Sequence, residues 1–176
     1  MIARLTVLLL LPASAAAQTC PQDRALALEL DNRKSAILCA TDNKQYEYER
    51  LDEAGRFHIV RTAVGDDFFY TLVLKGSGEQ IEVLSTPIWA TDKSRFVTVG
   101  CSLQPARGEI KISRPAGRGL ETEATFELPC ERESCLARWT GPGWLTVICT
   151  PRGDDKAKGT EFSVLLRAGT WAKFGR

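Results

Sequence analysis

The sequence has few of the residues on which common enzyme classes depend. His58 is the only histidine among 176 residues, although histidine is the usual proton carrier at neutral pH. No Gly-x-Ser-x-Gly elbow, phosphate-binding loop or dinucleotide fingerprint occurs, so three large enzyme classes have no support. His58 alternates with Phe57 and Ile59 in a predicted strand, which predicts that its ring faces solvent. We therefore expect no catalytic residue and no cofactor.

An excess of one charge sign and a long apolar run are also missing. The chain carries 23 basic and 22 acidic residues, whereas a nucleic-acid-binding protein usually presents a clear basic field. No apolar run reaches the roughly 20 residues that cross a bilayer as a helix. Nucleic acid is therefore not an expected partner, and no transmembrane segment is expected.

The first 17 residues have the features of a leader peptide. Arg4 precedes an apolar run over residues 5–11, and small residues lead to a predicted cleavage site after Ala17. The mature chain, residues 18–176, is then expected in the bacterial periplasm or outside the cell. Two alternatives stay open: an ordinary N-terminal helix, and a lipoprotein modified at Cys20, although the residues before Cys20 match a lipobox poorly.

The six cysteines lie in the mature chain, and an even number in an exported protein predicts disulfides, here three. No Cys-x-x-Cys pair is present, which argues against a zinc site and a thioredoxin-like redox site, so no metal is expected. Residues 126–129 and 136–139 look like two strands of a hairpin, which predicts a Cys130–Cys135 bridge. The remaining expected pairs are Cys101 with Cys149 and Cys20 with Cys39.

Short β-rich runs separated by turn residues occupy most of the mature chain. The predicted strands cover residues 36–40, 44–51, 57–64, 68–75, 80–84, 96–101, 109–113, 122–128, 144–149 and 160–167. Residues 21–34 fit a short helix or a strand equally well. We expect one all-β domain over residues 18–176, with antiparallel sheets arranged as a sandwich, an open barrel or a blade-like stack.

One internal repeat is visible around two tryptophans. Trp89 and Trp139 are each followed by a turn, an aromatic residue, a short β-branched run and a cysteine. The two tryptophans lie 139 − 89 = 50 residues apart, near the period of a four-stranded propeller blade. The segment around Trp89 resembles the tryptophan-plus-turn signature of exported propeller blades. The mature chain has room for about three such units, too few for an ordinary closed propeller.

Exposed aromatic and basic residues are the candidate binding residues, because aromatic rings bury much area with little loss of flexibility. Trp144 follows a Gly-Pro-Gly turn and Trp171 lies near the C-terminus. The densest basic stretch contains Arg107, Lys111, Arg114 and Arg118. We expect Trp89 and Trp139 in the core, and a contact surface that combines Trp144 with the basic stretch.

The composition favours an exported, non-catalytic binding domain whose partner is a protein or polysaccharide of the cell envelope or exterior. Three alternatives remain: an inhibitor of a secreted hydrolase, a carboxylate-dependent cell-wall hydrolase, and a structural subunit of a larger assembly. A hydrolase of that kind needs two carboxyl groups about 5–10 Å apart in a cleft. The adjacent acids Asp66–Asp67 and Asp154–Asp155 are interpreted as turn residues.

Overall fold

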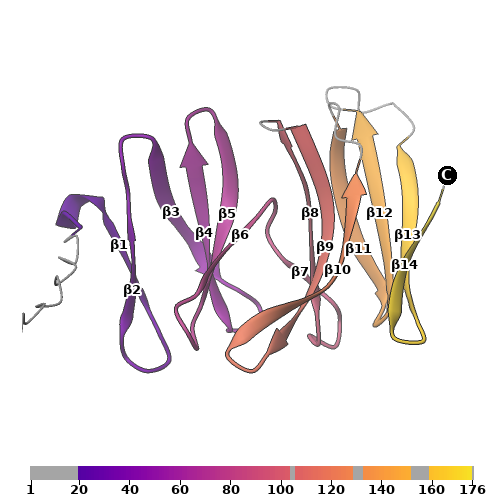
Figure 1. Ribbon diagram of the computed structural model, residues 1–176, viewed down its shortest axis with the longest axis horizontal. Helices are drawn as coiled ribbons and strands as arrows, with labels where there is room; N and C mark the ends of the chain where they lie inside the picture. The colour runs from indigo at the N-terminus through magenta and orange to yellow at the C-terminus, as the bar shows by residue number, and fades with distance from the viewer. Residues whose placement is uncertain (1–19, 104–105, 129–132, 152–158, 176) are drawn as a thin grey trace, which may run out of the picture.

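The computed structural model describes residues 20–103, 106–128, 133–151 and 159–175 (Figure 1). The predicted leader peptide, residues 1–17, lies outside these ranges. The described chain consists of strands joined by turns, apart from one short 3-10 turn, η1 (Gln22–Arg24). Within the described ranges, no helix is long and apolar enough to cross a membrane.

Four antiparallel sheets, here named A to D, follow one another along the chain. Sheet A pairs β1 (Ala25–Glu29) with β2 (Ser35–Cys39). Sheet B contains β3 (Lys44–Leu51), β4 (Phe57–Val64), β5 (Asp67–Leu74) and β6 (Gln80–Val83). Sheet C contains β7 (Ile88–Trp89), β8 (Phe96–Leu103), β9 (Ala106–Ala116) and β10 (Gly119–Leu128). Sheet D contains β11 (Glu133–Gly141), β12 (Trp144–Pro151), β13 (Thr160–Arg167) and β14 (Thr170–Gly175).

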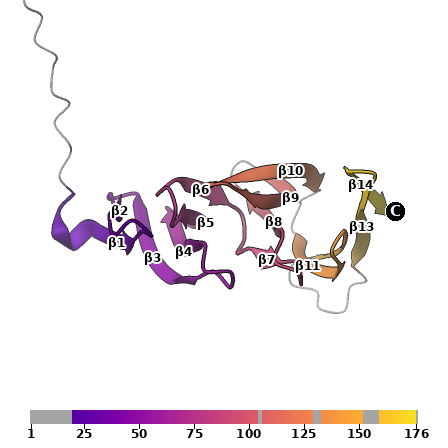
Figure 2. The same cartoon turned by 90° about the horizontal axis from the view of Figure 1, so that it is seen from below.

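The four sheets stand in a row, from sheet A at the N-terminal end to sheet D at the C-terminal end (Figures 1 and 2). In sheets B, C and D the spatial order of the strands follows their order in the chain. β11 contacts β7 and β8, while β14 contacts β10, so corresponding strands of sheets C and D lie over one another. Of the three predicted arrangements, the structure has the blade-like stack.

The core lies in the layers between successive sheets. Leu28 and Leu38 of sheet A pack with Val60 and Val73 of sheet B. The next layer joins the other face of sheet B to sheet C through side chains that include Phe57 and Phe96. The third layer joins sheets C and D. Because sheets B and C are covered on both faces, their central strands carry runs of buried residues, such as residues 57–60, 71–74 and 96–99.

The tryptophan repeat corresponds to a structural repeat. Trp89 lies in the first strand of sheet C and pairs with Phe96 of the second strand. Trp139 lies in the first strand of sheet D and pairs with Leu145 of the second strand. Each ring packs toward the preceding sheet, since Trp89 joins the layer between B and C and Trp139 the layer between C and D. The prediction that both tryptophans pack in the core is confirmed for Trp89, which is buried, whereas Trp139 is partly buried and packs against the core.

The hairpin predicted between residues 126–129 and 136–139 is wrong. β10 is the edge strand of sheet C and pairs with β9, whereas β11 is the edge strand of sheet D and pairs with β12. The two predicted strands therefore belong to different sheets.

The cysteine pairing changes for the same reason. Cys135 faces Cys149 across β11 and β12, with Cα atoms 4.0 Å apart, and the two form a disulfide. The predicted bridges Cys130–Cys135 and Cys101–Cys149 are therefore wrong. The predicted bridge Cys20–Cys39 is present and ties the start of the chain to β2. Cys130 and the side chain of Cys101 lie outside what the structure describes, so two disulfides are seen.

The N-terminal segment is a strand where the sequence left a helix possible. β1 begins directly after η1, and Leu26 and Leu28 point from it toward sheet B. His58 of β4 reaches the same layer, where its Nε2 atom donates a hydrogen bond to the Glu29 carbonyl at 2.7 Å. The residue is 8% exposed, so the prediction that His58 faces solvent is wrong. It fails because sheet A covers the face of sheet B that alternation alone assigns to water.

Candidate functional site

The outer face of sheet D carries an exposed apolar surface at the C-terminal end of the stack. Strand alternation sends one set of side chains toward sheet C and the other set outward. Four large apolar side chains of the outward set are exposed: Leu136 at 74%, Trp144 at 49%, Ile148 at 44% and Phe174 at 43%. We call these four residues and the outward side chains between them the C-terminal face.

The register of sheet D brings these side chains together. Leu136 lies directly opposite Ile148 across β11 and β12, and Trp144 lies opposite Leu165 across β12 and β13. Phe174 pairs with Ser163 at the β14 edge, and the Arg167 guanidinium lies 5.3 Å from the centre of its ring. The inward residues of the same strands, including Leu145, Val147 and Val164, are fully buried. The face is therefore a rigid surface whose back is anchored in the core.

A tight turn holds Trp144 at the edge of this face. The Leu166 N–H donates to the Gly143 carbonyl at 2.8 Å, and the Thr140 hydroxyl donates to the Trp144 carbonyl at 3.2 Å. A Cβ atom on Gly143 would lie 3.2 Å from Leu166 Cβ, so glycine allows the turn to approach β13 closely. Trp144 is exposed, as its place after the Gly-Pro-Gly turn predicted.

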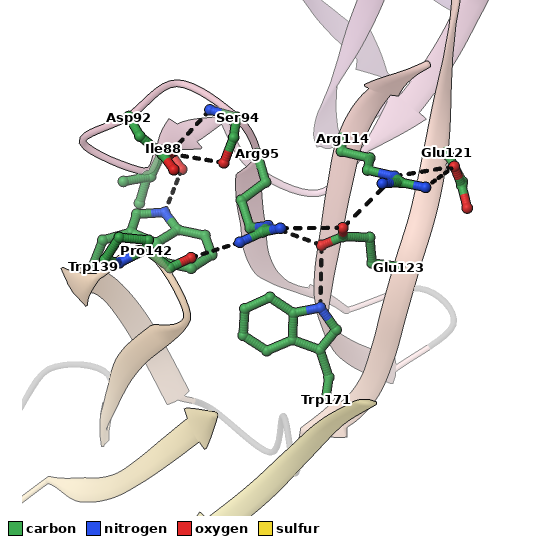
Figure 3. A network of polar contacts seen from close by, with 10 residues as sticks. All are labelled: Ile88, Asp92, Ser94, Arg95, Arg114, Glu121, Glu123, Trp139, Pro142 and Trp171. Carbon is green, nitrogen blue, oxygen red and sulfur yellow. Dashed lines mark hydrogen bonds and ion pairs between the residues drawn. The ribbon is translucent and has the colours of Figure 1, made fainter. Parts of the chain in front are cut away.

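Trp171, the second predicted contact, lies between sheets C and D instead of at the surface. It is 8% exposed, and its Nε1 atom donates to Glu123 Oε2 at 3.1 Å. Arg95 donates to the same carboxylate at 3.0 Å and to the Pro142 carbonyl at 2.7 Å (Figure 3). Glu123 and Arg95 together thus connect sheet C to two parts of sheet D, and the Trp171 ring fills the interface between the two sheets.

The structure does not gather the predicted basic stretch beside Trp144. Lys111 pairs with Glu109 at 3.1 Å, and Arg114 pairs with Glu121 at 2.8 Å. The side chain of Arg107 lies outside the described residues. Lys111 and Arg114 belong to β9 of sheet C, which sheet D separates from the C-terminal face. The expected combination of Trp144 with these basic residues therefore does not form one surface.

Arg118 instead borders a cavity of about 530 Å³ at the turns of sheets A, B and C. The lining comes from the β1–β2, β3–β4, β5–β6 and β9–β10 turns and includes Asp31, Arg56, Phe57, Leu74, Arg118 and Leu120. We call this cavity the turn pocket. Its volume is within the range of small-molecule sites. Asp31 is the one carboxylate in its lining, and it pairs with Lys75 at 3.1 Å.

Sequence reasoning missed most of both surfaces. Leu136, Ile148 and Phe174 are residue types that usually lie in the core. The sequence signal that could have identified them is alternation, because they occupy the strand positions that alternate with the buried residues. Arg56 and the apolar floor of the turn pocket come from segments far apart in the chain, so no local pattern joins them.

The described residues contain no group of three or more His, Cys, Asp or Glu side chains placed to hold a metal ion. Of the acid pairs noted in the sequence, Asp67 accepts a hydrogen bond from the Phe68 N–H at 2.8 Å in its turn. Asp154 and Asp155 lie outside the described residues. No protein-family model matches the chain, and no curated protein or solved structure is detectably similar to it.

Proposed function

We propose that this chain is an exported, non-catalytic binding protein that docks another protein on its C-terminal face. The observation that carries the proposal is the cluster of four large apolar side chains, each between 43% and 74% exposed, on one face of sheet D. Monomeric proteins seldom expose a contiguous apolar patch without a use for it. A flat, rigid sheet loses little conformational entropy when a partner covers it.

The chemistry of the face favours a protein partner over a polysaccharide. Sugar recognition needs polar groups that hydrogen-bond hydroxyls around an aromatic ring. Leu136 and Ile148 form an aliphatic pair that cannot hydrogen-bond sugar hydroxyls. Trp144 lies on the same face, with Thr146 between it and Ile148 on β12. An exposed tryptophan on the same face as an aliphatic pair is typical of an interface hot spot.

Export is supported by the two observed disulfides and by the leader-like residues 1–17. Disulfides persist in oxidising compartments such as the bacterial periplasm or the cell exterior. We propose that all six thiols are oxidised in the mature chain, and Cys101 with Cys130 is then the third pair by elimination.

The test is capture of partners by the mature chain, residues 18–176, from the envelope fraction and culture fluid of the source cells. Leu136→Asp places a charge beside Ile148 on the face, and Trp144→Ala removes the tryptophan ring. We expect each to weaken capture at least about tenfold, as for hot-spot residues. Ile37→Asp is the matched control, because Ile37 is 56% exposed on sheet A at the other end of the row (Figure 1).

Thermal unfolding of each variant separates loss of binding from loss of folding. Equal capture by the wild type and both face variants contradicts the proposal. A large drop in melting temperature for Trp144→Ala would show instead that the ring supports the fold.

An assembly subunit is a second candidate, and one observation favours it. The chain stacks sheet upon sheet, and the outer face of sheet D continues the same series of apolar layers. A second copy of the chain can therefore extend the stack. Sedimentation of the wild type and Leu136→Asp distinguishes the two: a concentration-dependent oligomer that Leu136→Asp dissociates identifies another copy as the partner.

A further inference from the structure

The turn pocket combines an apolar floor with two arginines at its rim. Leu120 and Pro115 are partly exposed and provide the apolar part of the lining that a ligand can touch. Phe57 and Leu74 of the same lining are buried, at 0% and 3% exposure. Arg56 and Arg118 are exposed residues of the same lining. The lining comes from sheets A, B and C, whereas the C-terminal face belongs to sheet D. Binding in the turn pocket therefore does not depend on the proposed function.

Two of the carboxylates near the pocket, Asp31 and Asp52, are already engaged. Asp31 pairs with Lys75 at 3.1 Å. Asp52, just before Arg56 in the chain, is 5% exposed, and its two oxygens accept hydrogen bonds from the backbone N–H groups of Ala54, Arg56 and Phe57. Neither acid is therefore available to neutralise an arginine of the pocket.

Within the part of the chain that the structure describes, neither guanidinium group has a hydrogen-bond or ion-pair partner. This holds for Arg118 toward every described residue. The Arg56 guanidinium lies 5.8 Å from the centre of the Trp89 ring, a contact that uses the face of the group and leaves its N–H edge for a ligand. Planar guanidinium groups match the oxygens of carboxylates and phosphates.

The fold fixes the position of Arg118. Gly117 has a φ of 59° at the first central position of the two-residue turn between β9 and β10, where hairpins need such a conformation. A Cβ atom on Gly76 would lie 3.7 Å from Arg118 Cβ, so the start of the arginine side chain rests on the β5–β6 turn of sheet B. The arginine is therefore held at the junction of sheets B and C.

We propose that the turn pocket binds a small organic anion, a carboxylate or a phosphate monoester with an apolar body, with Arg56 and Arg118 as its charge partners. The apolar body lies against Pro115 and Leu120, the partly exposed apolar residues of the lining. One carboxylate opposes this binding: Glu79 Oε2 lies 3.4 Å from the position of a Cβ atom on Gly119, a residue of the lining.

Calorimetric titration of the folded mature chain tests the proposal with four probes. Phenyl phosphate and benzoate have both an anion and an apolar body, and comparing them separates phosphate from carboxylate recognition. Benzyl alcohol lacks the charge and inorganic phosphate lacks the apolar body. We expect phenyl phosphate or benzoate to saturate the protein with a Kd on the order of 1 mM or below, and both reduced probes to bind about tenfold more weakly.

Three variants locate the binding. Arg118→Gln is expected to raise the Kd about tenfold, as for loss of a charged hydrogen bond. Glu79→Gln is expected to lower the Kd, because it removes a negative charge from the pocket edge. Arg138→Gln is the matched control, since Arg138 is an exposed arginine of β11 on the outer side of sheet D; its Kd should stay within about twofold of the wild type.

The proposal is overturned if neither anionic probe saturates, if benzyl alcohol binds as tightly as the anions, or if Arg138→Gln weakens binding as much as Arg118→Gln. Arg118 is exposed and lies in a turn, so its substitution should leave thermal unfolding unchanged. The Glu79→Gln variant provides a gain of affinity that a misfolded protein would not show.

Discussion

At the scale of single residues, Glu123 is one of the side chains that join sheets C and D directly. Its carboxylate accepts from Arg95 Nε at 3.0 Å and from Trp171 Nε1 at 3.1 Å, and its side chain is 13% exposed. We expect Glu123→Ala to lower the free energy of unfolding by about 3 kcal/mol, because it removes the carboxylate that a largely buried guanidinium and an indole N–H share. Urea denaturation measures the loss.

Glu121→Ala is the control for this substitution. Glu121 also pairs with an arginine, at 2.8 Å, but its side chain is 51% exposed. Water solvates that pair, so the expected loss is below about 1 kcal/mol. Equal losses for Glu121→Ala and Glu123→Ala would show that the network does not stabilise the interface.

Asp92 gives a prediction for pH dependence at the residue scale. Hydrogen bonds from the backbone N–H and then the hydroxyl of Ser94 lower the pKa of Asp92 from its ordinary value of 3.8. A carboxylate with a lowered pKa in the folded state stabilises the fold above its unfolded pKa, and this contribution is lost as pH falls through the folded pKa. NMR titration should place the midpoint below 3.8, and Ser94→Ala should move it upward. An unchanged midpoint in Ser94→Ala would contradict the hydroxyl contribution.

At the scale of elements, Gly100 marks the closest approach between the segment after β6 and strand β8. A Cβ atom on Gly100 would lie 2.6 Å from Leu84 Cβ and 2.9 Å from the Leu84 carbonyl oxygen. Because the backbone of Leu84 cannot yield as a flexible side chain would, we expect Gly100→Ala to destabilise the fold by about 1–3 kcal/mol. Thermal and urea unfolding report the change.

The control for Gly100→Ala is Gly119→Ala, also a glycine within a strand. A Cβ atom on Gly119 would lie 3.4 Å from its nearest neighbour, Glu79 Oε2. That oxygen is the end of a flexible side chain and can move away. The expected effect of Gly119→Ala is therefore within about 0.5 kcal/mol. A Gly100→Ala variant as stable as Gly119→Ala would show that β8 and Leu84 can move apart.

At the scale of the whole molecule, the state of the six thiols connects fold and compartment. Cys20–Cys39 staples sheet A and Cys135–Cys149 staples sheet D. Intact mass measured without reductant should lie about 6 Da below that of the fully reduced mature chain, one hydrogen for each thiol. Peptide mapping should find both observed bridges and link Cys101 to Cys130. Free thiols at Cys101 and Cys130 in native material would contradict the predicted third pair.

Strand positions were predictable because each strand carries its own pattern of side chains. Residues 44–51, 57–64 and 160–167 are strands with the bounds that the sequence predicts. Of the two surfaces, the sequence indicated only Trp144 and Arg118, because a turn exposes its residues wherever the rest of the chain lies.

The sequence by itself determined that this protein is built of antiparallel strands with cysteines close to their ends, since alternation and turn chemistry are local. Only the tertiary structure decided which sheet lies on each face. That choice pairs Cys135 with Cys149, buries Trp171 and His58, and leaves Leu136 in water. Apolar side chains can occur on either face of a strand, so alternation alone does not show which face is buried. Burial depends on the sheet that packs against each face, and that sheet comes from a distant part of the chain.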